Sequence, residues 1–422
     1  MPESLFRQQS EAFARRVFED TLAFSKDPET GVTREGYGPA EERLHDYLKA
    51  WGRGLGLEER TDAAGNLFLT LPGNDRALPS FMTGSHSDSV PQGGHFDGLA
   101  GIVAAMCAIR WLKEQGIALE RDVTLAAFRL EENSFFGRAY VGSSAFAGVL
   151  APEDLALRHR SGARTLADSI REAGFDPEAM TAGRPLADLS RIGAFVELHI
   201  EQGPTLDMNP ETRVGIVTGI RGSRLHKRAR CLGETAHAGA VDRRFRHDAV
   251  LAGADLLSRL DRHWDAWLAK GRDLVFTPGI ICTAPSAAVS VIAGEVAFSL
   301  DMRSLDPAVI DAFHELLLEE ARTVEKERGV RFEFDPILRM EPCALDPGLQ
   351  GAMEAAAAKA GIMVLRMPSG AGHDSAVLSN AGIPTGMIFV ANQDGSHNPR
   401  EKMKIDDFLL GAEVLLGTIE SF

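Results

Sequence analysis

The stretch Gly84-Ser-His-Ser-Asp-Ser-Val-Pro-Gln-Gly-Gly-His-Phe-Asp-Gly-Leu-Ala-Gly101 decides the fold of this chain, because it places polar side chains between small residues at a junction of two elements. The short apolar run Phe81-Met82 precedes it, and apolar residues at helical spacing follow it from Ile102 to Leu112. This order predicts a strand, a glycine-rich loop and a helix. In an open α/β sheet, ligands bind at the carboxyl ends of the strands, where such a loop lies.

The loop contains side chains of the kinds that bind metal ions, namely His86, Asp88, His95 and Asp97. The His-x-Asp spacing predicts that His86 binds a metal through one ring nitrogen, while Asp88 accepts the N–H of the other and fixes the tautomer. Asp97, next to the start of the helix, is predicted to be a carboxylate ligand. By itself, the pattern is also typical of a glycine-rich turn with hydrogen-bonded polar residues, so both interpretations stay open at this point.

The composition is that of a globular protein with a large core, with 44% apolar and 25% charged residues in a chain of 422. This length favours two domains. The net charge of −15 argues against a nucleic-acid partner. The four cysteines are far apart and form no Cys-x-x-Cys pair, which favours a reducing compartment without disulfides. With no signal-peptide pattern and no apolar run near the ~18 residues that span a bilayer, we expect a cytoplasmic protein without a membrane partner.

Two adjacent carboxylates, Glu131 and Glu132, follow the apolar run Asp122–Phe128, which is typical of a buried parallel strand. Such a strand would bring both carboxylates to the same sheet edge as the loop. Neighbouring residues at a strand end point to different faces, so one carboxylate can bind metal while the other stays free as a base. The alternative is a pair of solvated acids at the start of a loop.

A third imidazole is predicted at a sheet edge from the alternating segment Ala194–Ile200. Val196, Leu198 and Ile200 would take one face, so that Phe195, Glu197 and His199 share the other. Taken singly, a histidine that hydrogen-bonds a neighbour is the alternative interpretation of His199.

The chain between Val214 and Phe334 follows the order β-α-β-β-α-β of a ferredoxin-like sandwich. We therefore predict an α/β fold with a catalytic domain of residues 1–213 plus 334–422 and an inserted domain of residues 214–333. The predicted helices cover residues 5–24, 40–51, 248–268 and 307–328, with a terminal helix after Asp406; the predicted strands cover residues 67–71, 122–128, 194–200, 214–232, 274–282, 294–302, 330–334 and 385–390.

Eight motifs, in order along nearly the whole chain, resemble those of the hydantoinase/carbamoylase family of amidohydrolases. They are Gly84-Ser-His-Ser-Asp88, Gly93-Gly-His-Phe-Asp-Gly98, Glu131-Glu132, Glu197-Leu-His-Ile-Glu-Gln-Gly203, His237-Ala-Gly239, Asp301-Met-Arg303, Pro368-Ser-Gly-Ala-Gly-His-Asp374 and Ser396-His-Asn-Pro399. This family, which includes N-carbamoyl-L-amino-acid hydrolases, β-ureidopropionases and allantoate amidohydrolases, belongs to the di-zinc aminoacylase/carboxypeptidase superfamily. The resemblance implies a di-metal α/β catalytic domain with an inserted ferredoxin-like lid and dimerisation domain.

The resemblance also implies a set of five metal ligands for two divalent ions. The ligands would be His86 and His199 on one ion, Glu132 and His397 on the other, and Asp97 as the bridge. A mixed imidazole and carboxylate set suits Zn²⁺, Mn²⁺, Co²⁺ or Ni²⁺. Glu131, which binds no metal, would be the general base that takes the proton of a metal-activated water and passes it to the leaving nitrogen.

In the inserted domain, His237 matches an imidazole that reaches the active site of the partner in a homodimer and stabilises the developing oxyanion. Arg303 matches a residue that binds the substrate carboxylate through a bidentate pair. From the sequence alone, a loop histidine and an arginine paired with Asp301 are the alternatives. Gln202 and His373 match other substrate-binding positions.

The chain departs from the family pattern on the substrate face of the lid. Ala240-Val-Asp-Arg243 replaces the usual Thr-Thr-Pro-Met, and Ser290 stands where an asparagine commonly helps to bind the substrate carboxylate. Arg243 would therefore add a charge that meets a second acidic or polar group of the substrate. The alternative is that Asp242, Arg243 and Arg244 pair among themselves at a solvated edge.

These residues together predict a cytoplasmic, homodimeric, metal-dependent hydrolase of a linear amide or ureido C–N bond in a small, carboxylated substrate, of the N-carbamoyl-amino-acid or ureido-acid type. An N-acyl-amino-acid or dipeptide hydrolase of the same superfamily is the alternative within the enzyme class. A catalytically idle dimeric scaffold is the alternative outside it. An unligated Glu131 argues against the scaffold, since a structural metal site has no use for a free carboxylate.

Overall fold

The computed structural model describes residues 4–27 and 30–422, which form two compact units. Unit 1 comprises residues 1–218 and 345–422, and unit 2 comprises residues 219–344. The inserted unit begins five residues and ends eleven residues after the predicted boundaries, 219 against 214 and 344 against 333. The predicted fold class, an α/β domain interrupted by an inserted second domain, is confirmed. No helix among the described residues is long and apolar enough to cross a membrane.

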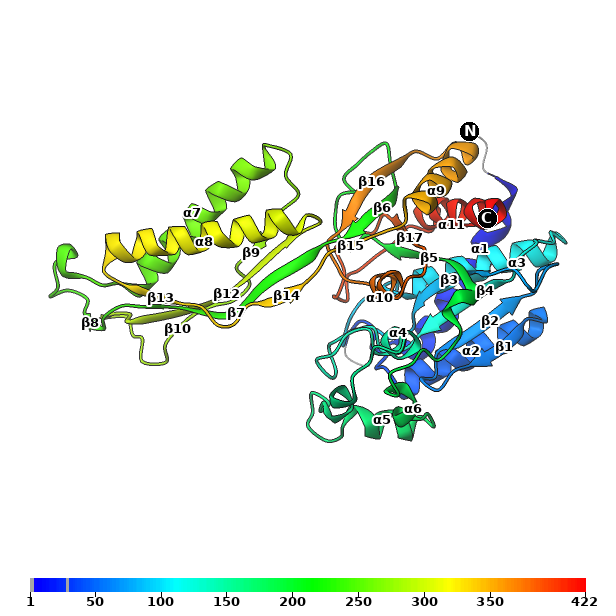
Figure 1. Ribbon diagram of the computed structural model, residues 1–422, viewed down its shortest axis with the longest axis horizontal. Coiled ribbons are helices and arrows are strands. Elements are labelled where there is room, and N and C mark those ends of the chain that lie inside the picture. The colour runs from blue at the N-terminus through cyan, green and yellow to red at the C-terminus, as the bar shows by residue number, and fades with distance from the viewer. Residues whose placement is uncertain (1–3, 28–29) are drawn as a thin grey trace. The chain divides into compact units, whose positions relative to one another are not determined.

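The larger sheet has nine strands in the order β1-β2-β4-β3-β5-β17-β6-β15, with β16 paired to β6 (Figure 1). Its strands belong to unit 1, except that the edge strand β15 and the last two residues of β6 fall within residues 219–344. The strands are β1 (Glu58–Thr61), β2 (Leu67–Leu71), β3 (Ser80–His86), β4 (Val123–Phe128), β5 (Ile192–Ile200), β6 (Val214–Ile220), β15 (Cys343–Ala344), β16 (Val364–Ser369) and β17 (Thr385–Val390). The four central strands β4, β3, β5 and β17 are parallel, whereas β1, β2, β6 and β15 pair antiparallel with their neighbours.

Helices cover both faces of this sheet. The larger core contains residues of α1 (Leu5–Ser25), α2 (Pro39–Leu55), α3 (Leu99–Glu114), α9 (Pro347–Ala360) and α11 (Ile405–Ser421). The opposite face packs against α4 (Val141–Phe146) and α10 (Asp374–Asn380), and α5 (Leu166–Glu172) and α6 (Pro177–Met180) contribute to a further cluster. The period-2 pattern of β2 shows why both faces are covered, because Leu67 and Leu69 enter the first core and Phe68 enters the second.

The parallel strands at the centre of the sheet bring the candidate metal-binding and proton-transfer residues to one edge. β3 ends at His86, β5 ends at Ile200 directly after His199, and β4 ends at Phe128 shortly before Glu131. Because neighbouring parallel strands run in the same direction, the segments that follow them emerge at the same edge. The predicted meeting of these three segments is therefore what the fold produces.

Unit 2 has a six-stranded antiparallel sheet in the order β10-β12-β7-β13, with β9 paired to β12 and β14 paired to β7. Helices α7 and α8 contact each other and this sheet (Figure 1). The elements are β7 (Gly222–Leu232), β8 (Ala236–His237), α7 (Ala249–Leu268), β9 (Val275–Thr277), β10 (Ile281–Thr283), β11 (Val291–Ile292), β12 (Glu295–Ser304), α8 (Pro307–Arg328), β13 (Arg331–Glu333) and β14 (Leu338–Met340). Their order and pairing are those of the predicted ferredoxin-like sandwich.

Two strands predicted as single elements are divided in the structure. The predicted strand 214–232 is β6 and β7, which belong to different sheets and are separated by Arg221. The predicted strand 274–282 is β9 and β10, which pair with different parts of β12. Both segments are extended over most of their length, as predicted, but an extended segment carries no information about which sheet the chain joins.

Candidate metal centre

The loop after β3 brings Asp97 against the histidines at the strand ends. Asp97 immediately precedes Gly98, the residue before α3, and the φ angle of Gly98 is +66°. A Cβ atom at Gly98 would lie 2.5 Å from Cε1 of His86. Any other residue at position 98 would therefore strain the backbone and push into the imidazole ring, which explains the glycine there.

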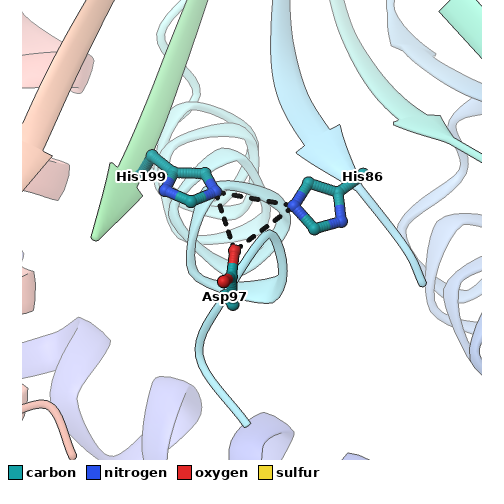
Figure 2. A group of neighbouring side chains, drawn as sticks. All are labelled: His86, Asp97 and His199. Carbon is teal, nitrogen blue, oxygen red and sulfur yellow. Dashed lines mark hydrogen bonds and ion pairs between the residues drawn. The ribbon is translucent and has the colours of Figure 1, made fainter. Parts of the chain in front are cut away.

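The first group of candidate ligands consists of His86, Asp97 and His199, and all three are buried. Oδ1 of Asp97 lies 3.4 Å from Nε2 of His86 and 3.1 Å from Nε2 of His199. The two Nε2 atoms are 3.5 Å apart. Figure 2 shows the two imidazole rings and the carboxylate converging on one point.

The second group consists of Asp97, Glu132 and His397. Nε2 of His397 lies 3.2 Å from Oδ2 of Asp97 and 3.1 Å from Oε1 of Glu132. Asp97 therefore directs one carboxylate oxygen to each group. The structure brings together all five residues that the resemblance implied as ligands, in the two sets that it implied, with Asp97 shared between them; His199 also lies in a third group, with Glu197 and His373.

The donor set fits divalent cations. Oδ1 of Asp97 is buried and accepts no well-oriented hydrogen bond from the described residues, which leaves a lone pair for a cation. Nδ1 of His199 lies 2.8 Å from the carbonyl oxygen of Ile200. This contact favours the tautomer with the proton on Nδ1 and leaves Nε2 as the donor atom.

The electrostatics of the cluster also favour bound positive charge. Burial alone would raise the pKa of Asp97, but contacts with the three histidines hold it well below its usual range. Hydrogen bonds with Asp97 and Glu132 raise the pKa of His397 to about 10. Without metal, protons on the imidazoles balance the carboxylates, and divalent ions would supply that positive charge instead.

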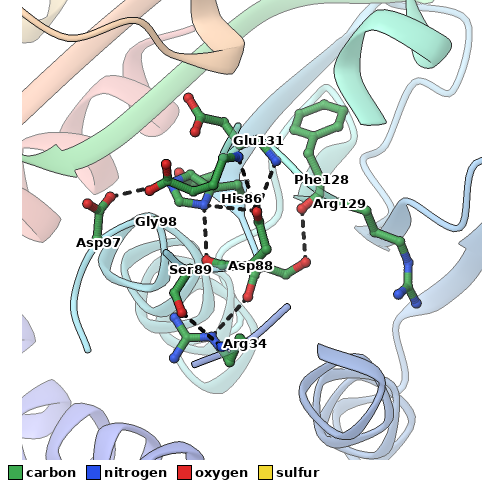
Figure 3. A network of polar contacts seen from close by, with 12 residues as sticks. Arg34, His86, Asp88, Ser89, Asp97, Gly98, Phe128, Arg129 and Glu131 are labelled. Atoms are coloured by element: carbon green, nitrogen blue, oxygen red, sulfur yellow. Dashed lines mark hydrogen bonds and ion pairs between the residues drawn. The ribbon is translucent and has the colours of Figure 1, made fainter. Parts of the chain in front are cut away.

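Asp88 links the two strand ends that carry the site. Its Oδ1 lies 3.3 Å from Nδ1 of His86 and accepts a hydrogen bond of 2.9 Å from the backbone N–H of Glu131, while Oδ2 accepts one of 3.1 Å from that of Glu132 (Figure 3). Leu130, just before this pair, has a φ angle of +48°. Nδ1 of His86 also lies 3.2 Å from the backbone carbonyl oxygen of Asp88, so Asp88 contacts this nitrogen through both its backbone and its carboxylate. The carboxylate also fixes the strained turn that carries Glu131 and Glu132.

Glu131 is the free carboxylate of the cluster. It belongs to neither candidate ligand group, and its side chain hydrogen-bonds no other described residue. Burial raises the pKa of Glu131 well above its usual range, and nearby Glu132 and Asp374 act in the same direction against the opposing effect of His86. A buried carboxyl group with a raised pKa and no structural partner is suited to proton transfer near neutral pH.

Gln202 and His373, predicted to bind substrate, both lie against the candidate ligands. Nε2 of Gln202 donates a hydrogen bond of 2.9 Å to Oδ2 of Asp97 and lies 3.4 Å from Nε2 of His397. The His373 ring packs edge-on against His199, with centroids 4.6 Å apart, and its Nε2 lies 2.9 Å from Oγ of Ser369. In this structure, both side chains support the ligand cluster directly.

His95, the last of the four side chains in the stretch 84–101 that are of a metal-binding kind, lies outside the candidate ligand groups. Its Nε2 lies 2.8 Å from the carbonyl oxygen of Phe18, and burial lowers its pKa to about 3. Arg34 is close by, with 3.5 Å between its Nη1 and Nδ1 of His95. His95 therefore serves the packing of the loop against α1.

The predicted residues His237 and Ser290 lie together in unit 2. His237 is exposed on β8, which pairs with β11. Nδ1 of His237 accepts hydrogen bonds of 3.1 Å from the backbone N–H groups of Gly239 and Ala240. These bonds place the ring proton on Nε2, which is then available as a donor. The carbonyl oxygen of Ser290 accepts a hydrogen bond of 3.0 Å from the backbone N–H of Ala238. The segments that carry His237 and Ser290 are therefore held side by side.

Arg303 forms the pairing that the sequence left open as an alternative. Its Nε and Nη2 donate hydrogen bonds of 2.9 and 2.7 Å to Oδ2 of Asp301. Arg303 and Asp301 are two residues apart on β12, so they project from the same face of the strand.

In the loop after His237, Arg244 and Asp242 form an exposed ion pair at 3.9 Å, and the side chain of Arg243 has no partner among the described residues.

Two residues that support the centre were missed by the sequence analysis. Oε1 of Glu401 accepts hydrogen bonds of 2.8 and 3.2 Å from the backbone N–H groups of Phe96 and Asp97. Oγ of Ser396 lies 2.5 Å from Oε2 of Glu401 and 2.7 Å from Oδ2 of Asp97. A Cβ atom at Gly94 would lie 2.0 Å from Cδ of Glu401, so the second glycine of the Gly93-Gly94 pair makes room for this carboxylate.

We expect Glu401→Ala to weaken metal binding by about 10–100-fold, the usual effect of removing a group that orients a ligand. The substitution leaves the backbone at Asp97 without its acceptor, while all five candidate ligands remain. Titration of metal-stripped protein with Zn²⁺ measures the change. Glu420→Ala, which removes an exposed carboxylate from α11, is the matched control. Equal Zn²⁺ affinity in the two variants would show that Glu401 does not position Asp97.

Comparisons with known proteins agree with this geometry. Residues 82–421 match the family described as peptidase family M20/M25/M40. The chain is 35% identical over 397 residues to an N-carbamoyl-L-amino acid amidohydrolase of Geobacillus stearothermophilus, covering 93% of this chain and 94% of that protein. It is 34% identical over 409 residues to an allantoate amidohydrolase of Escherichia coli (strain K12), covering 95% of this chain and 96% of that protein.

A solved structure of a hydantoinase/carbamoylase family amidase from Burkholderia multivorans superimposes with a TM-score of 0.89, at 30% identity and with 97% of each chain covered. The family match spans most of the chain, and the similarity to named amidohydrolases extends through both units. The chain therefore belongs to peptidase family M20/M25/M40, and it is an amidohydrolase of the hydantoinase/carbamoylase type.

Proposed function

We propose that this amidohydrolase splits a ureido or linear amide C–N bond in a small, carboxylated substrate of the N-carbamoyl-amino-acid or ureido-acid type. The observation that carries the proposal is the pair of ligand groups sharing Asp97, with the unligated Glu131 beside them. The names of the relatives support the substrate class, since they include N-carbamoyl amino acid, allantoate and ureidoglycolate hydrolases.

We propose that two divalent ions, Zn²⁺ or Mn²⁺ with Co²⁺ or Ni²⁺ as further candidates, bind the two ligand groups. When bound, such ions lower the pKa of water toward ~7 and polarise the carbonyl group of the substrate. Glu131 takes the proton of the attacking water and returns it to the leaving nitrogen. Asp88 holds His86 and the backbone of Glu131 in the geometry that this transfer requires.

Unit 2 serves in this proposal as the lid and dimerisation domain, while unit 1 is the catalytic domain. His237 would act in the partner's active site, where its Nε2–H donates to the oxyanion that develops on the scissile carbonyl. The two backbone N–H groups that donate to Nδ1 support this role, because they leave Nε2 as the ring nitrogen that carries a proton and points away from its own loop. Arg303 and Ser290 would bind the carboxylate of the substrate.

We expect fully reconstituted protein to hold about two ions per chain after desalting, as a shared carboxylate between two sites implies. His397→Ala should retain about one, because it removes a ligand from the second group only. His263→Ala is the control, since this histidine also pairs with a carboxylate, Glu320, but lies in unit 2. Metal analysis by mass spectrometry measures the content. A stoichiometry near zero, with activity indifferent to chelator, would contradict the proposal and favour the idle scaffold.

We expect Arg303→Ala to raise KM by about 10–100-fold for carboxylated substrates, the usual effect of losing hydrogen bonds to a charged group. Substrates that lack the carboxylate should be unaffected. A panel of N-carbamoyl, N-acyl and ureido compounds measures this difference and names the preferred class. Arg331→Ala is the matched control, because Arg331 also lies on a strand of unit 2 and pairs with an acid two residues away.

The same panel tests the loop after His237. Arg243→Ala should raise KM only for the preferred substrate if Arg243 meets a second acidic group of that substrate. Equal kinetics of this variant and the parent across the whole panel would remove Arg243 from substrate recognition. Preference for an N-acyl amino acid or a dipeptide over every ureido compound would establish the alternative activity within the superfamily.

A further inference from the structure

Unit 2 contains a solvent-open hollow of about 780 Å³ formed entirely by its own residues. It is lined by the loop that leads into α7, by the start of α7 and by the last turn of α8; Figure 1 shows where α7 and α8 lie in the chain. Its lining residues are Arg243, Arg244, Arg246, His247, Asp248, Leu251, Asp255, Lys326, Glu327, Arg328 and Gly329. The volume is within the usual range of small-molecule sites.

Positive charge exceeds negative charge around this hollow, although the whole protein is acidic. Five arginine or lysine side chains line it, against three carboxylates. The carboxylates are already bound: Asp255 accepts hydrogen bonds from Arg259 and Arg328, and Glu327 accepts one from Arg259. Arg259 lies outside the lining and is shared among Asp255, Glu327 and Glu320, so the net positive charge of the hollow comes from the excess of its five lining cations over its three carboxylates.

Two of the cations, Arg243 and Lys326, have no partner in the described part of the chain. Both are exposed, and neither forms a hydrogen bond or ion pair with another side chain there. Arg246 is committed differently, because it donates hydrogen bonds to the carbonyl oxygens of Val241 and Ala238 and so fixes the loop. Two unpaired cations held in one hollow repel each other, and a bound anion would relieve that repulsion.

The frame of the hollow is fixed by close contacts. A Cβ atom at Gly329, which has a φ angle of +65°, would lie 2.2 Å from Nδ1 of His247. The 20-residue helix α7 begins at the hollow, and its cap Asp248 accepts a hydrogen bond of 3.0 Å from the N–H of Leu251. The amino end of α7 adds positive potential and the carboxyl end of α8 adds negative potential, so the net charge of the hollow is set by its side chains.

We propose that this hollow binds a small organic polyanion with at least two acidic groups, either phosphates or carboxylates. The planar guanidinium of Arg243 suits bidentate recognition of one group, and the ammonium of Lys326 binds another as a point charge. This site differs from the carboxylate site proposed for Arg303, and the inference does not depend on the amidohydrolase activity.

The test is calorimetric titration of the metal-loaded protein with fructose 1,6-bisphosphate in one arm and tricarballylate in the other. We expect one saturable site per chain in at least one arm, and the arm that binds more tightly identifies phosphate or carboxylate as the ligand group. Arg243→Ala and Lys326→Ala should each weaken binding by about fivefold or more, since each removes a charged contact. Both residues are exposed, so circular dichroism should show an unchanged fold.

Two matched variants locate the binding. Lys270→Ala removes a cation just beyond the far end of α7, about 30 Å along the helix from the hollow, and should bind like the parent. Arg303→Ala should also bind like the parent if the hollow is the site. Loss of binding in Arg303→Ala but not in Lys326→Ala would overturn the proposal, because the anion would then occupy the substrate site. Absence of saturable binding in both arms would equally overturn it, and Lys326 would then only compensate the dipole of α8.

Discussion

Replacing Glu131 with glutamine is expected to lower turnover by at least ~100-fold, the lower range for a positioned general base, and to leave the metal content unchanged. Glutamine keeps the shape of the side chain and loses the proton acceptor. Glu131 is outside the candidate ligand groups; its backbone N–H donates to Asp88 and its carbonyl oxygen accepts from Tyr140, while its side chain has no hydrogen-bond partner among the described residues. The substitution therefore removes the proton-transfer group without disturbing the metal ligands or the turn that positions them.

Glu132→Gln is the control for this prediction, because it makes the same chemical change in the adjacent residue. Glu132 lies 3.1 Å from His397 in the second ligand group. The Glu132→Gln variant should therefore lose metal as well as activity. Kinetics and metal analysis on the same samples distinguish the two roles. If Glu131→Gln loses metal while Glu132→Gln keeps it, the two carboxylates have exchanged roles and the proposed base is wrong.

Mixing two inactive variants is expected to restore activity if His237 acts in the partner's site. Glu131→Gln chains supply an intact His237, and His237→Ala chains supply an intact Glu131. A mixed dimer then has one complete site. Random pairing in an equal mixture makes half of the dimers mixed, so about one quarter of the parental activity should return. Both variants alone should be nearly inactive, because each lacks a group that acts in the transition state.

The control for this experiment is a mixture of Glu131→Gln chains with chains that carry both substitutions, which contains no complete site. Native mass spectrometry shows whether subunits exchange. Failure to recover activity, with exchange demonstrated, would mean that His237 works within its own chain or takes no part in the reaction. Recovery in the control mixture would instead mean that Glu131 is not required.

The local sequence predicted most individual elements of the fold, because their signals are short-range. The alternation of apolar residues predicted β5 and the shared face of Glu197 and His199. The helix cap Asp306, followed by Pro307, predicted the start of α8. The divided strands were missed, since β6 and β7 are both extended and only their partners differ. Pairing is a property of the assembled sheet, which periodicity along one strand does not record.

The sequence by itself determined which residues are able to bind metal and transfer a proton. The chemistry of imidazole and carboxylate groups at strand ends is fixed by residue type and by position along the chain. Motif order, through the resemblance, assigned Asp97 to both ion sites and left Glu131 free. The motifs did not include Glu401, because nothing in its neighbourhood signals a partner 304 residues earlier in the chain.

Only the tertiary structure decided how those side chains are held. Parallel pairing of β3, β4 and β5 brought their ends together, and Asp88 joined two of them through backbone hydrogen bonds. The contacts of Gln202 and Glu401 with Asp97 likewise depend on segments that are distant in sequence. The physical reason is that hydrogen bonds and charges act over a few ångströms in space, so the groups that orient a ligand become neighbours only when the chain has folded.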